Sequence, residues 1–151
     1  MYRLGKLSAR LEGGLIRYVR QMAWLHATPK PAEQRPGSSA RAKLTRMEQL
    51  KASGVAVQMP PNPAPHIVNW LIEAGLRGSE GALSWGEINA WQVGTGQQLD
   101  AFETKLIHKL SVEYVAMGRK AEDESCPAPW AAPVTAAERD ASEARLRSVL
   151  G

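Results

Sequence analysis

The spacing of apolar residues near the start of the chain predicts a long amphipathic helix. Large apolar side chains recur at intervals of three and four over residues 2–27, which places them on one helical face. The stripe consists of Leu4, Leu7, Leu11, Leu15, Tyr18, Met22 and Leu25. Such a face suits a core or self-association contact, a partner-docking helix or a membrane-surface helix. Gly13 and Gly14 each cost about 1 kcal/mol relative to alanine inside a helix, so we expect a break or kink there.

Proline and glycine divide the next part of the chain. Residues 28–39, TPKPAEQRPGSS, cannot continue a helix and are predicted to form a linker. Residues 40–53 are predicted to form a polar helix that ends at Gly54 and faces inward through Leu44, Met47 and Leu50. In residues 55–65 two alternating valines permit a short extended piece, and four prolines then predict a stiff connector. This connector is either a spacer or a docking segment for an aromatic groove.

Two short helices with clear end signals follow. The first is predicted over residues 66–77 and is stopped by Gly78. Its apolar face consists of Ile67, Trp70, Leu71 and Ala74. The second begins after Ser84, because Ser84 and Glu87 match a capping box and the residues flanking the box match a hydrophobic staple. The staple residues are Leu83 and Ile88, and the apolar face of this helix consists of Trp85, Ile88 and Trp91.

The longest helix of the C-terminal half is predicted over residues 99–119. Asp100 is a suitable N-cap, and Glu103 lies at the third helical position. The apolar stripe consists of Leu99, Phe102, Leu106, Ile107, Leu110, Tyr114 and Met117. Residues 121–133 are acidic and then rich in proline, so we expect an exposed tail. Beyond them a second capping box, Thr135 with Glu138, predicts a polar helix that ends near residue 150.

These patterns predict an all-α protein, a small multi-helix domain of short capped helices with proline-rich linkers and an N-terminal amphipathic helix. We expect a basic helical region over residues 1–58, a proline-rich linker over 59–65 and a helical core domain over 66–120. An acidic and proline-rich tail with a C-terminal helix is expected over 121–151. The composition agrees, because the 44% of hydrophobic residues are mostly alanine and leucine, which favour helix.

Charge is unevenly distributed along the chain. Residues 1–58 contain 11 Lys and Arg against 3 Asp and Glu, a formal charge of +8. Residues 59–151 contain 8 against 12, a formal charge of −4. Two oppositely charged halves indicate either two surfaces with different partners or a head-to-tail self-attraction of the protein, and a solvated basic helix is a third interpretation.

The single cysteine, Cys126, cannot form a disulfide within one chain, which fits a reducing compartment. Arg17 and Arg20 interrupt the basic N-terminal segment, which therefore lacks the apolar region of a signal peptide. The sequence contains no stretch of about 18 apolar residues, the length required for a membrane span. We therefore expect a protein of the cytoplasm that has no membrane partner.

The sequence offers no group of residues with the spacing that catalysis or metal binding requires. His26, His66, His108 and Cys126 are too far apart in sequence to match a metal-binding pattern. A nucleophile pair of Cys126 with His108 is disfavoured, because the acidic residues before Cys126 would weaken its thiol as a nucleophile. Phosphate-binding and dinucleotide-binding loops are also missing. We expect no enzymatic activity, no metal and no cofactor.

DNA binding is the strongest alternative to a protein-binding role. Two helices over residues 84–93 and 99–119, joined by a glycine-containing turn, have the outline of a helix-turn-helix. The second helix, however, would present Asp100 and Glu103 to the phosphates, which they repel. A nucleic-acid-binding packaging or regulatory accessory protein would instead use the basic N-terminal half.

Several short motifs recur in a familiar order between residues 60 and 130. They are LSWGEINAW at 83–91, Thr95-Gly96, Leu99, Phe102-Glu103, Ile107, LSVEYV at 110–115 and CPAPW at 126–130. In order and spacing they resemble the tail assembly chaperones of tailed bacteriophages. Phe102 departs from the pattern, because relatives more often have Trp-Glu at this pair. The resemblance does not extend to residues 1–58, and it does not distinguish a short form from a long form of such a chaperone.

The resemblance implies a non-enzymatic role in the host cytoplasm. Such chaperones bind the tape measure protein before the tail tube assembles, can recruit tail tube protein, and are not retained in the virion. We expect the tryptophans to build a small core and one client-binding edge. The partner-binding residues expected on this basis are Trp70, Trp85, Ile88, Trp91, Phe102, Leu106, Leu110 and Tyr114. The N-terminal helix would supply self-association, giving a homo-oligomer, or a second contact.

Overall fold

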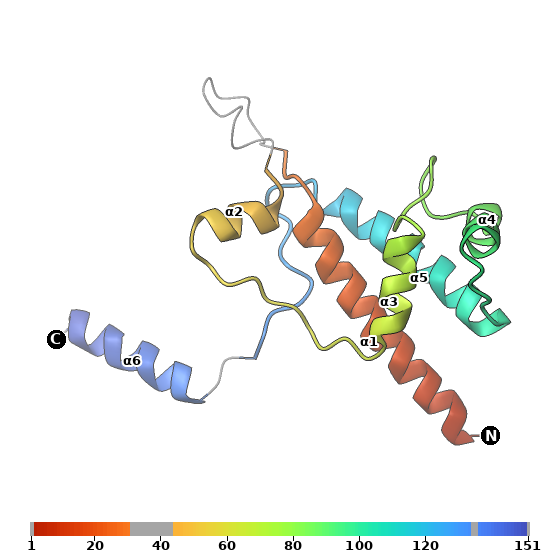
Figure 1. The fold of residues 1–151 in the computed structure, drawn as a ribbon. Coiled ribbons are helices and arrows are strands. Elements are labelled where there is room, and N and C mark those ends of the chain that lie inside the picture. Colours follow the sequence, from red (N-terminus) through yellow and green to blue (C-terminus); the bar gives the residue numbers. More distant parts are fainter. Residues whose placement is uncertain (1, 31–43, 134–135, 151) are drawn as a thin grey trace.

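The fold is known from a computed structural model, which describes residues 2–30, 44–133 and 136–150. These residues form six helices, and the expected all-α class is confirmed (Figure 1). The helices are α1 (Tyr2–His26), α2 (Arg46–Ala52), α3 (Pro65–Glu73), α4 (Trp85–Thr95), α5 (Ala101–Lys120) and α6 (Ala136–Leu150). The linker expected over residues 28–39 lies mostly outside the described residues.

Helices α1 and α5 lie against each other and run in the same direction (Figure 1). Two ion pairs join them: Lys109 Nζ lies 2.6 Å from Glu12 Oε1, and Arg20 Nη2 lies 2.8 Å from Glu113 Oε2. Surface pairs of this kind contribute at most about 1 kcal/mol each, so they fix register more than stability. Arg20–Glu113 joins a cation of the basic front half to a carboxylate of the acidic back half, whereas Lys109–Glu12 joins the two halves in the opposite sense.

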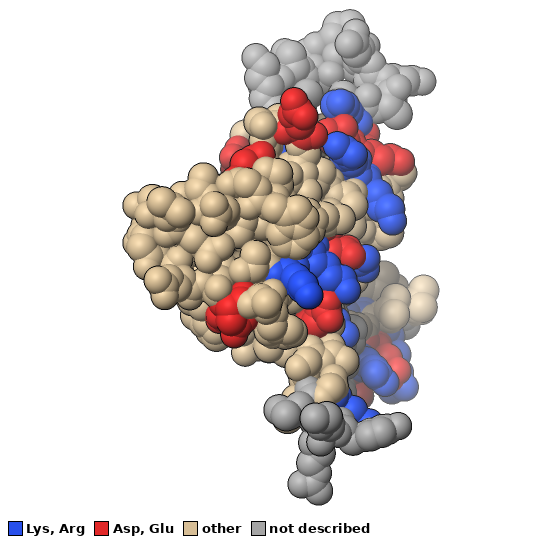
Figure 2. Space-filling model, turned by 90° about the vertical axis from the view of Figure 1, so that its right-hand side faces the viewer, with Lys and Arg blue, Asp and Glu red and all other residues tan. Residues whose placement is uncertain are grey.

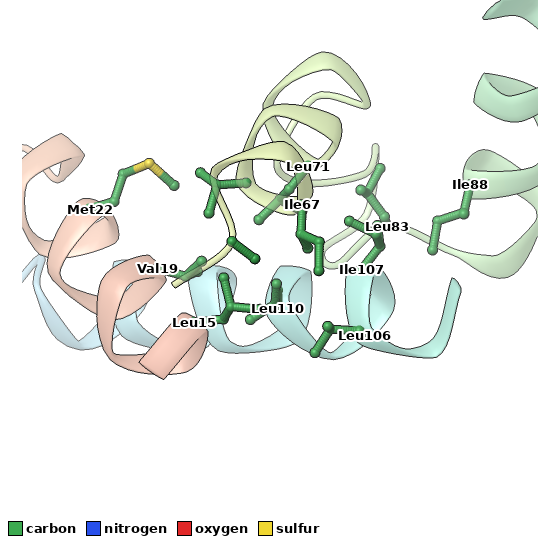
Figure 3. Close-up of a cluster of buried hydrophobic side chains, with 12 residues drawn as sticks. Leu15, Val19, Met22, Ile67, Leu71, Leu83, Ile88, Leu106, Ile107 and Leu110 are labelled. Atoms are coloured by element: carbon green, nitrogen blue, oxygen red, sulfur yellow. The ribbon is translucent and has the colours of Figure 1, made fainter. Parts of the chain in front are cut away.

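The main core lies where α1, α3 and α5 meet, with one side chain from α4 at its edge (Figure 3). Its buried members are Leu15, Val19, Met22, Ala64, Ile67, Val68, Leu71, Leu83, Ile88, Leu106, Ile107 and Leu110. The stripe predicted on the N-terminal helix is therefore largely a core face from Leu15 onward. The core also crosses the expected boundary at residue 58, so the N-terminal region and the helical core domain over 66–120 share one core.

The expected break at Gly13 and Gly14 is absent, and α1 is continuous from Tyr2 to His26. A Cβ atom on Gly14 would lie 3.0 Å from Cγ of Pro63, closer than most Cβ contacts. Gly14 thus allows the proline-rich connector to pack directly on α1. The connector is held a second time, because Gln21 Nε2 donates to the Gln58 carbonyl at 3.0 Å. It forms no strand; Pro60 is buried, whereas Val55 and Pro61 remain exposed, so the spacer and docking interpretations both stay predictions.

The polar helix predicted over residues 40–53 is shorter than expected. Residues 40–43 lie outside the described part, and α2 begins at Arg46 after the N-cap Thr45, whose side chain accepts from Glu48 N at 3.2 Å. The three residues expected to face inward, Leu44, Met47 and Leu50, are only half-buried. Gly54 ends the helix as predicted, with a φ of +71°.

The buried residue of α2 is Arg46, and it contacts the C-terminal ends of both α1 and α5. Its guanidinium donates to the carbonyl of Asp123 at 2.7 Å and to that of Ala121, with a longer contact of 3.5 Å to Trp24 O. Its Cζ also lies 4.8 Å from the centroid of the Trp24 ring. Because α1 and α5 run in the same direction, their negative dipole ends lie together, and the cation of Arg46 offsets both.

Helix α3 ends at Glu73, four residues before the predicted end at residue 77. Leu76 N donates to Leu71 O at 2.9 Å and Gly75 N donates to Ile72 O at 3.0 Å, the pair of bonds that defines a Schellman motif. Gly75 has a φ of +107°, which favours glycine, so the helix stops there and not at Gly78.

The predicted capping box of α5 is confirmed, with Asp100 and Glu103 each bonded to the other's backbone N–H.

The segment over residues 121–133 is mostly exposed, as expected, but it is held against the rest of the fold at several points. Ala121 is fully buried, and Lys30 N donates to Glu122 O at 2.8 Å. Trp24 Nε1 donates to Cys126 O at 2.9 Å, which holds the segment against the end of α1.

Helix α6, in contrast, stands apart from the rest of the described chain (Figure 1). The capping box expected at Thr135 lies outside the described residues.

Arg46→Met should lower the free energy of unfolding by about 3 kcal/mol. The methionine keeps most of the buried volume, but the carbonyls of Ala121 and Asp123 lose their charged donor, and each such loss costs about 1–3 kcal/mol. Urea unfolding followed by circular dichroism measures this difference. Lys51→Met, exposed on the same helix, is the matched control. An Arg46→Met loss no larger than that of the control would contradict the role assigned to Arg46.

Stability should fall as the pH falls below the ordinary histidine pKa of 6.5. Burial lowers the pKa of His26, whose Nδ1 lies 2.9 Å from the Tyr114 hydroxyl. The unfolded chain therefore binds the proton more tightly than the folded chain, and protonation favours unfolding from about pH 6.5 down to the folded pKa. Urea unfolding at pH about 7.5 and about 5.5 spans this range. His26→Gln should reduce the difference, whereas His66→Gln, at an exposed position, should retain it. An undiminished difference in His26→Gln would show that another group is responsible.

Candidate protein-binding surface

Helix α4 carries the candidate surface, and its N-terminal end is firmly placed. Ser84 is the N-cap, and its Oγ accepts from Glu87 N at 3.1 Å. The Glu87 carboxylate accepts from Ser84 Oγ at 3.2 Å instead of reaching the N-cap backbone, so only half of the predicted capping box is formed. The expected staple residues, Leu83 and Ile88, both lie in the main core. The helix ends at Thr95, with Gly96 as a left-handed C-cap at φ +72°.

The loop between α3 and α4 is held by two polar side chains of α5. Ser111 is fully buried; its Oγ donates to Leu76 O and accepts from Leu83 N, both at 2.8 Å. His108 Nδ1 lies 2.9 Å from Leu83 O, and because a carbonyl can only accept, Nδ1 carries the proton. These bonds satisfy backbone groups at both ends of the loop and fix where α4 starts. No sequence pattern indicates this role for Ser111, which lies in an otherwise apolar stripe.

Trp85 lies at the surface and contacts His108, one of the two anchoring side chains. Its ring stacks on that of His108, with the centroids 4.1 Å apart and the planes at 26°. The opposite side of the indole remains accessible, and 53% of the residue is exposed. His108 thus holds Trp85 in a fixed orientation at low entropic cost, a favourable property for a residue that contacts a partner.

The remainder of α4 contributes little to the core. Ile88 is its only buried residue, whereas Val93 is 77% exposed. Phe102 in the first turn of α5 is 45% exposed, so the predicted apolar stripe of that helix leaves the core at its N-terminal end. Exposed large apolar side chains of this kind suit a contact with another protein.

This region is also nearly free of charge. Residues 81–99 contain a single charged residue, Glu87, although 23% of the whole chain is charged. Figure 2 looks onto the side of the molecule where α4 and the start of α5 lie, and a broad surface without Lys, Arg, Asp or Glu covers its left part. We call the exposed residues of α4 together with Phe102 the α4 face.

The structure separates the eight expected partner-binding residues into two groups. Three belong to the core, namely Ile88, Leu106 and Leu110, and they cannot touch a partner in this conformation. Five reach the surface to different degrees, namely Trp70, Trp85, Trp91, Phe102 and Tyr114. Of these, Trp85, Trp91 and Phe102 lie on α4 or next to it. Tyr114 is at the other end of α5 beside His26, and Trp70 lies on α3 with an edge-on contact to His66.

Trp91 has an unusual environment for a half-buried tryptophan. Its Nε1 is buried and has no hydrogen-bond partner among the described residues. Tryptophan N–H groups normally find an acceptor when they are buried, and an unpaired one costs about 1–3 kcal/mol.

The ionisable groups of the described residues do not gather into one site. No group of three or more His, Cys, Asp and Glu residues within these ranges is placed to hold a metal ion. Each histidine has an aromatic neighbour instead: His26 has Tyr114, His66 has Trp70 and His108 has Trp85. None of the described helices is long and apolar enough to cross a membrane.

Comparisons with protein-family models, with curated proteins and with solved structures give no match for this chain. The fold class therefore rests on the structure, and functional inference rests on the α4 face and on the sequence motifs that surround it.

Ser111→Ala should lower the free energy of unfolding by about 2 kcal/mol. The substitution leaves the buried Leu83 N–H and the Leu76 carbonyl without their common partner, and unsatisfied buried groups cost about 1–3 kcal/mol. Thermal or urea unfolding measures the loss, and the amide proton of Leu83 should exchange faster with solvent. Ser79→Ala, at an exposed position in the same loop, should change neither quantity. Equal effects from the two variants would contradict the anchoring role of Ser111.

Proposed function

We propose that this protein is a tail assembly chaperone of a tailed bacteriophage, which binds the tape measure protein through the α4 face in the host cytoplasm. The observation that carries the proposal is the exposed, nearly uncharged surface of α4 and the first turn of α5. This surface lies in the middle of the segment that resembles such chaperones, over about residues 60–130. In this role the protein assists tail tube assembly, has no enzymatic activity and is not retained in the virion.

The physical task of such a chaperone is to cover the apolar face of a long client helix until the tube forms. A client helix that packs against Trp85, Val93 and Phe102 removes apolar surface of both molecules from water. The absence of ion pairs across most of the contact keeps it tolerant of the client's exact sequence. Release follows when tail tube protein competes for the same client face.

The three core residues among the expected contacts act indirectly in this proposal. Ile88 attaches α4 to the core, and Leu106 and Leu110 are the contribution of α5 to the same core. Substituting them would disturb the position of α4 as well as stability, so they are poor probes of client binding. Phe102 is a better probe, because nearly half of it is exposed.

Nucleic-acid binding by the basic N-terminal half has less support. Arg20 is paired with Glu113, Lys30 is paired with Glu122, and Arg46 is buried among backbone carbonyls. These three cations are engaged within the molecule, which reduces the positive charge that phosphates could contact. We retain this alternative as an outcome of the experiment below.

Co-expression with the tape measure protein encoded in the same genome tests the proposal. We expect the client to stay soluble only with this chain, and the two to co-elute in size-exclusion chromatography with light scattering. Phe102→Asp should weaken co-elution at least about tenfold, because a carboxylate is costly to bury in an apolar contact. Val112→Asp is the matched control, since Val112 is similarly exposed on the same helix outside the α4 face.

Two results would contradict the proposal. One is a client that aggregates regardless while this chain elutes alone. The other is equal client binding by the Phe102→Asp and Val112→Asp variants. If the chain instead shifts DNA at micromolar concentration in a salt-dependent manner, the nucleic-acid alternative is favoured.

A further inference from the structure

The first turns of α1 extend beyond the rest of the helical core. From residue 5 onward, where side chains are described, Leu15 is the first fully buried residue of this helix, which begins at Tyr2. Lys6, Leu7 and Arg10 are exposed, and Leu7 is 61% exposed despite its position in the apolar stripe. Figure 1 shows this end of α1 projecting past the other helices. We call residues 2–11 the α1 extension.

The α1 extension and the α4 region carry opposite charges. Residues 2–11 contain Arg3, Lys6 and Arg10 and no acidic residue. Residues 80–104 contain no Lys or Arg, and their four acidic residues are Glu80, Glu87, Asp100 and Glu103. The acidic residues lie before, within and after the segment that forms the α4 face. An apolar face with an acidic border matches a helix that is apolar on one side and basic beside it.

The α1 extension cannot reach the α4 face of its own molecule. Helix α1 is continuous into the core, where Leu15 and Val19 are fully buried, so the extension points where the rigid helix directs it. Folding back would break the helix and its hydrogen bonds. The occupant that this chain supplies for the α4 face is therefore the extension of a second copy.

We propose that the α1 extension of one copy packs on the α4 face of a second copy, and that the second copy returns the same contact. Both elements lie on the same side of the molecule, at the right in Figure 1, which a reciprocal arrangement requires. Two identical contacts related by a two-fold axis close the assembly as a dimer. Leu7 covers the apolar centre near Val93, while Lys6 and Arg10 face the acidic border.

The dimer covers the surface that the proposed function assigns to the client. Self-association and client binding then compete, so the free protein would keep its apolar face out of water until a client displaces the second copy. The proposal for the dimer does not rest on the client, and its test contains none. Either proposal can therefore fail alone.

Size-exclusion chromatography with light scattering on the full chain is the first test. We expect a dimer at concentrations up to about 100 µM, where a contact with a micromolar Kd is saturated. Leu7→Asp and Val93→Asp should each weaken self-association at least about tenfold, because each places a carboxylate in the apolar contact. Both positions are exposed in the single molecule, so circular dichroism should show unchanged helix content. Val112→Asp should leave the dimer intact.

A charge exchange tests whether the two named elements meet. Variant one, Lys6→Glu with Arg10→Glu, makes the α1 extension acidic. Variant two, with Glu80→Lys, Asn89→Lys, Ala90→Lys and Gln98→Lys at four exposed positions, makes the α4 region basic, because four lysines then stand against three remaining acidic residues. Each variant alone should be mainly monomeric, since both of its contacts then join like charges. An equal mixture should form a dimer with one copy of each, because both contacts are again complementary.

Three results would overturn the dimer proposal. The first is a wild-type chain that is monomeric at about 100 µM, well above a micromolar Kd. The second is a wild-type dimer that Leu7→Asp leaves intact, and the third is a mixture of the two charge variants that remains monomeric.

Discussion

The fold depends on how the C-terminal ends of α1 and α5 come together. The two helices run in the same direction, so their unsatisfied carbonyls and negative dipole ends meet at one place. Arg46 supplies a buried guanidinium to these carbonyls, and Trp24 covers its face. The same place fixes α2, the end of α1 and the segment after Ala121. One arginine thus ties three parts of the chain that are distant in sequence.

At the N-terminal end of α5, the neighbouring helix α4 makes fewer buried contacts with the core. Ser111 and His108 fix the loop that precedes α4, but α4 itself inserts only Ile88 into the core. An α-helix with one buried residue gains little hydrophobic stabilisation from the rest of the fold. In a monomer its exposed apolar residues remain in contact with water, which is unfavourable. Their exposure is explained if the surface of another molecule covers them. The C-terminal end of α5 therefore contributes mainly to stability, and the region of its N-terminal end provides the surface for binding.

Periodicity and capping signals were sufficient to predict where most helices lie. Asp100 with Glu103 and the leucine stripe of α1 act over a few residues, so the sequence shows them directly. Burial of Arg46 and packing of residues 121–133 depend on segments brought together from far apart, which local patterns do not report. The exposure of Phe102 could not be predicted for a related reason. Spacing identifies the apolar face of a helix, but it does not show how far along that face the neighbouring helices pack. The α4 face could be suspected from its tryptophans, yet its exposure required the structure.

The pairing of α1 with α5 also determines when the protein can fold during synthesis. Trp24 and Cys126 are hydrogen-bonded although 102 positions separate them, and Arg20 meets Glu113 across 93 positions. The apolar face of α1 leaves the ribosome long before its partner has been made. Contacts of such long range favour slow folding and leave apolar surface uncovered in the meantime. The nascent chain is therefore exposed to premature association until α5 and the segment that follows it have been translated.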